Sequence, residues 1–207
     1  GTHALISSGI EFSHLGLVIT DEQHRFGVGQ RIALGQKGQS PHTLVMSATP
    51  IPRTLALMIY GDLDISVIDT MPMGRLPVKT YAIDGAKRQR AYGYIKRHLD
   101  QGYQGYIICP LVEPGEVDLG LISASEYAEQ LQQHEFSDYR VGLLHGKMKA
   151  ADKDAVMQQF KDGAIDLLVA TTVVEVGVDV PNAVIMLIEN AERFGLSQLH
   201  QLRGRVG

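Results

Sequence analysis

The 207-residue sequence has little cysteine and no excess of positive charge. Its single cysteine, Cys109, cannot form an internal disulfide, which excludes a disulfide scaffold and suits a reducing compartment. Nineteen Lys and Arg against 23 Asp and Glu give a formal net charge of −4. This balance excludes a basic clamp that holds polyanions by its bulk field, so any contact with nucleic acid must be local.

Long hydrophobic runs are missing as well. No segment approaches the roughly 18 uninterrupted apolar residues of a membrane span, and the N-terminus lacks a basic region followed by an apolar stretch. We therefore expect no membrane partner and a cytoplasmic chain. Hydrophobic residues at 44% and charged residues at 20% are typical of globular proteins, while 22 glycines predict tight turns or close approach to a ligand.

Short apolar runs alternate with stretches of helical periodicity, which predicts an α/β fold built from βαβ units with a mostly parallel sheet. We expect strands at Leu15–Thr20, Thr43–Ser47, Ile65–Ile68, Val78–Ile83, Gly105–Pro110, Arg140–Leu144, Leu167–Ala170 and Val184–Ile188. We expect helices at 25–35, 52–60, 86–101, 123–135, 149–162 and 197–203.

The segment 69–77 carries two prolines and a glycine without periodicity, which predicts a linker. We therefore expect a first domain at 1–68 and a second at 78–207. The second has enough elements for its own core, whereas the first has only three predicted strands and is expected to lack its beginning. The chain starts with Gly rather than Met and ends in mid-motif, so we expect a fragment.

Two carboxylates end the first apolar strand, in the run Asp21-Glu22-Gln23-His24. In an open α/β sheet, ligands sit at the carboxyl ends of the strands. There Asp21 can hold a hydrated Mg²⁺, and Glu22 can orient and deprotonate an attacking water. The simpler alternative is an acidic turn with a helix cap. A metal site built from Asp21 and histidines needs a preformed cluster that the spacing does not supply.

Small hydroxyl residues, Ser47 and Thr49, follow the next apolar strand. Hydroxyls at a strand tip can hydrogen-bond a neighbouring acidic cluster and report its state across a cleft. Taken alone, this segment is a turn and a helix start.

Polar residues also follow two strands of the second half. Hydroxyls and backbone amides near Thr171 can take phosphate oxygens without net positive charge, and Asp179, beyond Gly177, can accept from a ribose hydroxyl. Gly146 lets the backbone approach a polyanion closely. The preceding His145 is also typical of an ordinary turn.

The last helical segment ends in Arg203-Gly204-Arg205. Two arginines at such a tip are suited to bidentate phosphate contacts. A solvated helix end, favoured by the helix dipole, is the alternative.

The order and spacing of these motifs resemble the motor of superfamily 2 helicases, and within it the RecG family of ATP-dependent DNA helicases, which remodel stalled forks and branched junctions. The stretches Asp21–Gln30, Ser47–Asp69 and Thr171–Gly207 look particularly close. Transcription-repair coupling translocases share much of the pattern, but Tyr60–Ser66 and Pro72–Arg75 look more like the RecG family. The resemblance spans essentially all 207 residues.

The resemblance implies RecA-like parallel sheets flanked by helices, with one incomplete lobe and one nearly complete lobe. It implies ATP and Mg²⁺ as cofactors, and ATP hydrolysis between two lobes that moves DNA in repair and recombination. Branched DNA, such as stalled forks and Holliday junctions, is the implied partner, and single-stranded DNA-binding protein is a further candidate.

Site roles follow from the resemblance by position. Asp21 would hold Mg²⁺ through water, Glu22 would position the attacking water, and Ser47 and Thr49 would couple hydrolysis to motion. The catalytic set is Asp21, Glu22, Gln201 and Arg205. The nucleotide-binding set is Asp21, Gln23, His24, Gly177, Asp179, Arg203 and Arg205. The DNA backbone would meet Thr2, His145, Gly146 and Thr171.

Three departures from the family pattern limit the expected activity. The phosphate-cradling loop G-x-x-x-x-G-K-[ST] is absent, the family's last arginine falls one position beyond Gly207, and the junction-splitting wedge and a later hairpin are missing. We expect this chain alone to bind ATP weakly and hardly hydrolyse it. Two alternatives stay open: a double-stranded DNA translocase of the transcription-repair coupling type, and an α/β domain that binds nucleotide or protein without turnover.

Overall fold

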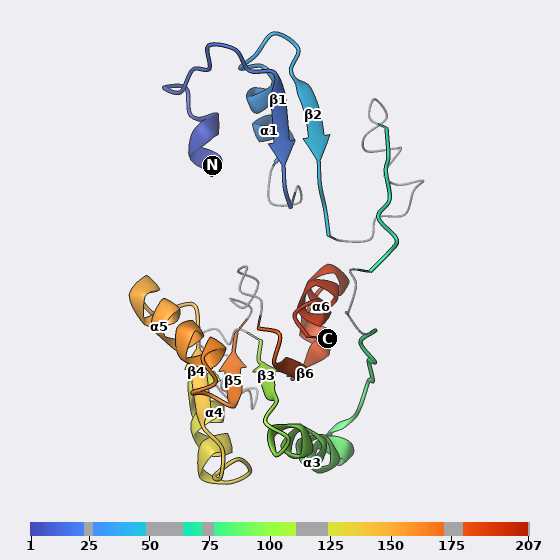
Figure 1. Cartoon of the computed structure of the whole chain (residues 1–207), viewed down its shortest axis with the longest axis vertical. Coiled ribbons are helices and arrows are strands. Elements are labelled where there is room, and N and C mark those ends of the chain that lie inside the picture. The colour runs from blue at the N-terminus through green and yellow to red at the C-terminus, as the bar shows by residue number, and fades with distance from the viewer. Residues whose placement is uncertain (23–26, 49–63, 72–76, 111–123, 172–179, 207) are drawn as a thin grey trace. The chain divides into compact units, whose positions relative to one another are not determined.

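The computed structural model describes residues 1–22, 27–48, 64–71, 77–110, 124–171 and 180–206. The chain divides into two compact units, Gly1–Ser66 and Val67–Gly207, each with its own sheet (Figure 1). Among the described residues, no helix is both long and apolar enough to cross a membrane. The helix expected at 52–60 lies outside them.

The first unit contains one βαβ arrangement. A 3-10 turn, η1 (His3–Ile6), precedes β1 (Leu17–Thr20), α1 (Val28–Gly35) and β2 (His42–Val45). The two strands are parallel, and their register pairs the first residue of β1 with His42 and its last residue with Val45. Parallel pairing places the carboxyl ends of both strands at the same edge of the sheet.

The second unit holds a four-stranded parallel sheet in the order β4-β5-β3-β6. Its strands are β3 (Gln104–Ile108), β4 (Val141–Leu144), β5 (Leu167–Ala170) and β6 (Ala183–Ile188). Its helices are α3 (Arg88–Leu99), α4 (Ala124–Gln133), α5 (Ala150–Lys161) and α6 (Leu196–Arg203), with 3-10 turns η3 (Gly85–Lys87) and η6 (Ala191–Arg193).

Two hydrophobic clusters cover the two faces of this sheet. Tyr106 and Ile108 of β3 pack in one cluster with Phe160 of α5, and Ile107 packs in the other with Leu131 of α4. All five residues of β3 are buried. A near-continuous apolar run is what a parallel strand covered on both faces requires, which explains why this strand shows no polar alternation.

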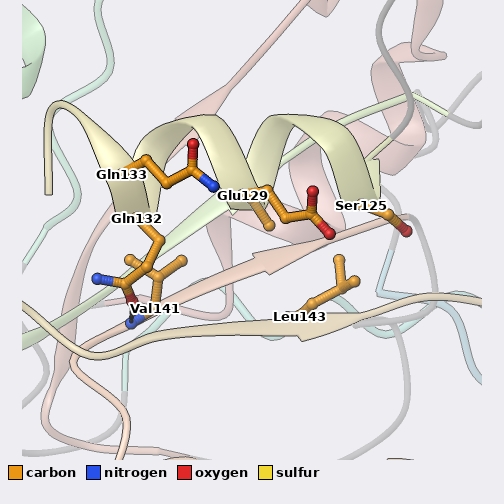
Figure 2. A pocket seen from close by; sticks show the side chains of 7 residues that line it. Ser125, Glu129, Gln132, Gln133, Val141 and Leu143 are labelled. Atoms are coloured by element: carbon orange, nitrogen blue, oxygen red, sulfur yellow. Dashed lines mark hydrogen bonds between the residues drawn. The ribbon is translucent and has the colours of Figure 1, made fainter. Parts of the chain in front are cut away.

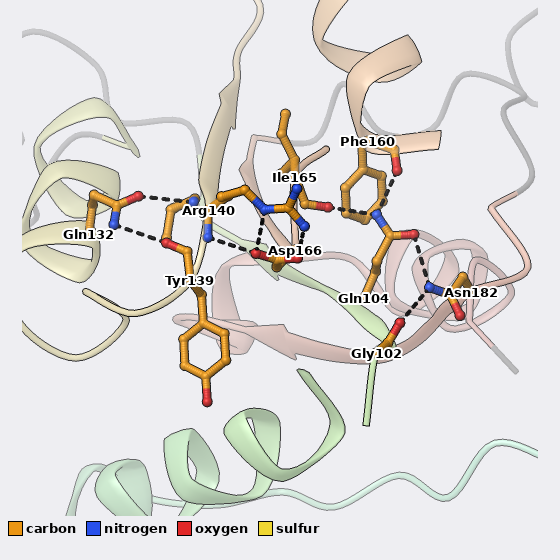
Figure 3. A network of polar contacts seen from close by, with 10 residues as sticks. Gly102, Gln104, Gln132, Tyr139, Arg140, Phe160, Ile165, Asp166 and Asn182 are labelled. Atoms are coloured by element: carbon orange, nitrogen blue, oxygen red, sulfur yellow. Dashed lines mark hydrogen bonds and ion pairs between the residues drawn. The ribbon is translucent and has the colours of Figure 1, made fainter. Parts of the chain in front are cut away.

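Side-chain amides tie the amino ends of the strands together (Figure 3). The side-chain amide of Gln104 donates to the carbonyls of Phe160 and Ile165, both at 2.6 Å. The amide of Asn182 donates to the Gly102 carbonyl at 2.9 Å. The bonds of Gln104 satisfy polar groups that burial would otherwise penalise.

Two expected strands are wrong. Neither Ile65–Ile68 nor Val78–Ile83 forms a strand, and neither pairs with any part of the chain that the structure describes. Ile68 is 91% exposed and Tyr81 is 77% exposed. β-branched and aromatic residues favour a strand only where a neighbouring strand and a core cover them.

The other described elements match their expected positions with small shifts at the ends, and the α/β class with parallel sheets flanked by helices is confirmed. The helix expected at 86–101 begins as the separate turn η3 before α3. The division between the units falls just before the end expected for the first domain.

Candidate functional site

The first unit brings Asp21, Glu22 and Ser47 to one edge of its sheet. Asp21 follows β1 directly, and Ser47 follows β2 after one residue. The backbone N–H of Met46 donates to the Thr20 carbonyl at 2.8 Å, which holds the two strand tips side by side. Two acids and a hydroxyl residue therefore share the carboxyl end of a parallel pair, where α/β sheets bind ligands.

The backbone turns sharply between the two acids. Glu22 has φ 48°, in the left-handed region that non-glycine residues rarely adopt. Its N–H donates to Oδ1 of Asp21 at 2.8 Å, and this hydrogen bond offsets part of the conformational free energy that the turn costs. Such strain at a strand tip is typical of functional sites.

The residues present fit a magnesium ion held through water. The Asp21 side chain is exposed and uses Oδ1 for the Glu22 N–H, so Oδ2 can accept from an ion-bound water. Within the described ranges, no group of three or more His, Cys, Asp or Glu residues is arranged to hold a metal. A single carboxylate suits Mg²⁺, which keeps several waters and binds substrate phosphates.

The second unit presents a row of residues at the carboxyl edge of its sheet. The order of the strands places His145 after β4, Thr171 after β5, Cys109 after β3 and Glu189 after β6. Backbone bonds continue the pairing past the strand ends. Thr171 N donates to the Leu144 carbonyl at 3.1 Å, and Glu189 N donates to the Ile108 carbonyl at 2.9 Å.

Thr171 carries a buried hydroxyl that has no hydrogen-bond partner among the described residues. The residue is 4% exposed, and its Oγ1 accepts or donates no hydrogen bond within the part of the chain that the structure describes. An unsatisfied buried polar group costs about 1–3 kcal/mol. A hydrogen bond between this hydroxyl and a phosphate oxygen would remove that cost when the phosphate binds.

His145 and Gly146 lie in a tight turn before α5. The His145 N–H points at the Met148 sulfur at 3.4 Å, and the Lys153 ammonium donates to the Gly146 carbonyl at 2.8 Å. Gly146 is exposed and His145 is half-buried. Because β4 and β5 are paired, the exposed backbone of this turn shares the carboxyl edge of the sheet with Thr171, an arrangement suited to a phosphate.

The residues at the end of α6 are anchored by their neighbours. Leu202 and Val206 are buried in the core, which fixes the backbone between them. Arg203 is exposed and contacts the His200 ring nitrogen at 3.1 Å, whereas Gln201 and Arg205 are half-buried. The predicted helix end is confirmed, since Gly204 caps α6 with N–H bonds to the carbonyls of its last turn.

Other predicted site residues stand apart or lie outside the described ranges. Thr2 caps η1, where its hydroxyl accepts the Ala4 N–H at 3.4 Å, so a local structural role is present. The residues outside the described ranges are Gln23, His24, Thr49, Gly177 and Asp179.

The sequence reasoning missed Glu189. Its carboxylate accepts from the Tyr127 hydroxyl and from the Arg88 guanidinium, each at 2.6 Å, and Tyr92 shares a short hydrogen bond with Tyr127. The signal was available, because Glu189 follows an apolar strand directly, as Asp21 does.

Burial governs the ionisation of this network. It raises the pKa of the Tyr127 hydroxyl, and the hydrogen bond to Glu189 raises it further, so Tyr127 stays protonated as a donor. Burial also raises the pKa of the nearby Cys109 thiol to about 12. Cys109 is therefore a neutral core residue, as expected for a lone cysteine in an apolar run.

A shallow pocket lies between α4 and the outer strand β4 (Figure 2). Its volume is about 240 Å³, and its lining includes Glu129, Gln132 and Leu143. Gln132 is already used, since its side chain accepts from Val141 N at 3.0 Å and donates to the Tyr139 carbonyl at 3.0 Å. None of the predicted site residues contributes to this pocket.

Comparison with known proteins identifies relatives over the whole chain. An ATP-dependent DNA helicase RecG from Synechocystis sp. is 54% identical over 207 residues, which cover 100% of this chain and 25% of the relative. A RecG from Bacillus subtilis is 53% identical, with 100% of this chain and 30% of the relative covered. The chain thus spans less than a third of these relatives, and the resemblance to RecG is confirmed.

Solved structures also show the similarity to RecG and to other helicases. A structure of RecG bound to a three-way DNA junction has a TM-score of 0.70 and 49% identity, covering 100% of this chain and 26% of that one. The helicase MrfA, solved with DNA and AMPPNP, has a TM-score of 0.59 at 19% identity, covering 93% of this chain and 29% of that one, which shows a shared fold.

A family model described as the helicase conserved C-terminal domain matches residues 86–207. These residues contain α3, the whole four-stranded sheet and α6. The chain therefore belongs to the family of helicase conserved C-terminal domains.

Proposed function

We propose that this chain is a motor segment of an ATP-dependent DNA helicase or translocase of the RecG type, acting on branched DNA such as stalled forks and Holliday junctions. The observation that carries the proposal is the pair of acids at the tip of β1 beside Ser47. The position of the pair, the exposed side chain of Asp21 and the left-handed backbone of Glu22 suit Mg²⁺ and water at a triphosphate. The RecG relatives support the same chemistry.

In this proposal the first unit supplies Asp21 as the holder of hydrated Mg²⁺ and Glu22 as the residue that positions water. Ser47 and Thr49 couple hydrolysis to motion. The second unit supplies Gln201 and Arg205 at the phosphates. The remaining nucleotide contacts come from Gln23, His24, Gly177, Asp179 and Arg203.

Residues of both units would contact the sugar-phosphate backbone of the DNA. Residues 69–77 would form the linker between the units. The Thr171 hydroxyl, which has no partner in the described part of the chain, supports a phosphate contact. His145 and Gly146 adjoin it at the same edge, and Thr2 lies on the first unit. Contacts to the DNA backbone give little base specificity and a strong dependence on salt.

Two further assignments belong to the same proposal. The solitary buried cysteine suits the reducing cytoplasm, where we place the protein. Single-stranded DNA-binding protein is a candidate partner, since it coats the single strands that branched junctions expose.

Glu22→Gln tests the proposal in a longer chain that supplies a G-x-x-x-x-G-K-[ST] loop. Loss of the carboxylate should lower the ATP hydrolysis rate by a factor of about 10²–10⁴ while ATP affinity is kept, because Glu22 acts on water rather than on nucleotide. Ser8→Ala, at an exposed position before β1, is the matched control. An unchanged rate in Glu22→Gln would contradict the proposal and favour a domain that binds without turnover.

A further inference from the structure

The outer helix of the second unit, α3, differs in charge from the rest of the chain. It carries Arg88, Arg90, Lys96, Arg97 and His98 and no acidic residue, whereas the whole chain has a formal net charge of −4. Basic residues in its last turn fit the helix dipole, but those of the first turn do not. Arg88 is paired with Glu189. The positive charge of the outward face therefore comes from the other basic residues of α3.

Aromatic rings lie among these cations in a continuous chain of contacts. The Arg97 guanidinium lies over the Tyr94 ring at 5.1 Å from its centroid. Tyr94 and His98 have ring centroids 4.6 Å apart, and His98 and Tyr103 have centroids 6.4 Å apart. We call Arg97, Tyr94, His98 and Tyr103 the aromatic ladder. Two of its rings are large and accessible, since Tyr94 is 50% exposed and Tyr103 is 41% exposed.

Glycine in the middle of α3 is a second, independent observation. A Cβ built at Gly93 would meet no atom within 4 Å, and the residue is exposed with helical backbone. Alanine would therefore fit and would favour the helix, so neither packing nor conformation explains the glycine. A missing side chain on an exposed face lets another chain approach the helix backbone closely.

The spacing of these residues places them on one face. Arg90, Gly93, Tyr94 and Arg97 are three, four and seven positions apart, which aligns them on one side of a helix. The buried residues of α3, Tyr92, Ile95 and Leu99, form the opposite side. Because Tyr103 precedes β3, the ladder extends toward the amino edge of the sheet, away from Thr171 and His145.

We propose that this face of α3, with the aromatic ladder, is a second site that binds single-stranded nucleic acid. Guanidinium groups contact phosphates, and exposed rings and guanidinium planes stack with unpaired bases. A duplex hides its base faces, so the exposed rings favour a single strand over a duplex. The site is separate from the proposed nucleotide chemistry and requires no ATP.

Fluorescence anisotropy with a labelled oligothymidylate of about 20 nucleotides tests this site in the 207-residue chain without nucleotide. Tyr94→Ala should weaken binding about tenfold, while Tyr94→Phe, which keeps the ring, should change it less than about twofold. Arg97→Gln should lower the slope of log Kobs against log salt concentration by about 0.7. Lys161→Gln, an exposed cation at the end of α5, is the matched control and should change neither quantity.

Gly93→Ala adds a readout that a structural role does not predict. It should raise the midpoint temperature of thermal unfolding of the second unit, which contains α3, and yet weaken oligonucleotide binding several-fold. The effect of Tyr94→Ala should also persist in a His145→Ala background, because α3 packs on β3 and β6, whereas His145 follows β4 at the other side of the sheet.

Three results overturn the proposal. The first is an unchanged affinity for the oligonucleotide in both Tyr94→Ala and Arg97→Gln. The second is a blunt duplex that binds as tightly as the single strand and loses the same affinity in Tyr94→Ala. The third is no binding of the oligonucleotide by the unsubstituted chain. A failure of Glu22→Gln to alter hydrolysis would count against the proposed motor and leave this site standing, so the two failures are distinguishable.

Discussion

The Tyr127 hydroxyl of α4 donates a 2.6 Å hydrogen bond to the carboxylate of Glu189 at the carboxyl end of β6. Arg88 of α3 donates to the same carboxylate, whose side chain is only 12% exposed. One acid thus joins two helices to a strand tip. This tip leads directly into η6 and then α6, the helix that ends in the candidate phosphate-binding arginine.

Tyr127→Phe should destabilise the protein by about 1–3 kcal/mol. The substitution keeps the ring in the core and removes the donor, so a mostly buried carboxylate loses a charge-assisted bond. The free energy of unfolding in urea, followed by far-ultraviolet circular dichroism, measures the change. Tyr81→Phe, at a tyrosine that is 77% exposed, should have almost no effect. Equal stabilities for the two variants would show that the Glu189 network contributes nothing measurable.

Thr171→Val should stabilise the protein by about 1 kcal/mol and weaken its binding to DNA. Valine has nearly the same shape as threonine and removes a buried hydroxyl that has no described partner. If that hydroxyl serves a phosphate, its removal costs affinity while stability rises. Urea unfolding and anisotropy with a labelled fork measure the two quantities. A loss of stability with unchanged affinity would mean that the hydroxyl has a structural partner instead.

Cys109 should resist thiol reagents until the protein opens. Because burial raises its pKa to about 12, the thiol stays protonated at pH 8, and its native-state reaction should be on the order of 10³-fold slower than in urea. The rate should keep rising with pH up to about 12 rather than levelling off near the value for a free thiol. Colour release from an aromatic disulfide reagent measures this rate. Fast labelling of the folded chain at pH 8 would contradict the buried position.

Prediction from sequence succeeded where a local pattern and the tertiary environment agree. The apolar run before Asp21 predicts a strand, and the structure places it in a parallel pair. Ile65–Ile68 and Val78–Ile83 have the same β-branched and aromatic character. They are not strands, because large side chains such as Val67 and Tyr81 are exposed and no strand within the described ranges pairs with them.

The candidate site was only partly predictable for a related reason. A residue at or directly after the end of a predicted strand lies at the carboxyl edge of the sheet, and this rule predicts the positions of His145, Thr171 and Ser47. The Glu189 network joins residues 62 and 101 positions apart in the sequence, and no spacing rule connects such residues before the fold is known. The aromatic ladder also depends on Tyr103, which lies beyond the end of α3 and meets His98 only through the turn between them.

Under the proposed function, the two units supply complementary parts of one ATP-hydrolysing motor, and Arg205→Gln tests this proposal most directly. The measurement is the DNA-stimulated ATP hydrolysis rate of a longer chain that supplies the phosphate-binding loop, with Arg193→Gln of η6 as the matched control. If Arg205 stabilises the transferring phosphoryl group, its loss should reduce the rate by about 10³–10⁵, while the control stays within about twofold. A rate in Arg205→Gln equal to that of the control would contradict the account.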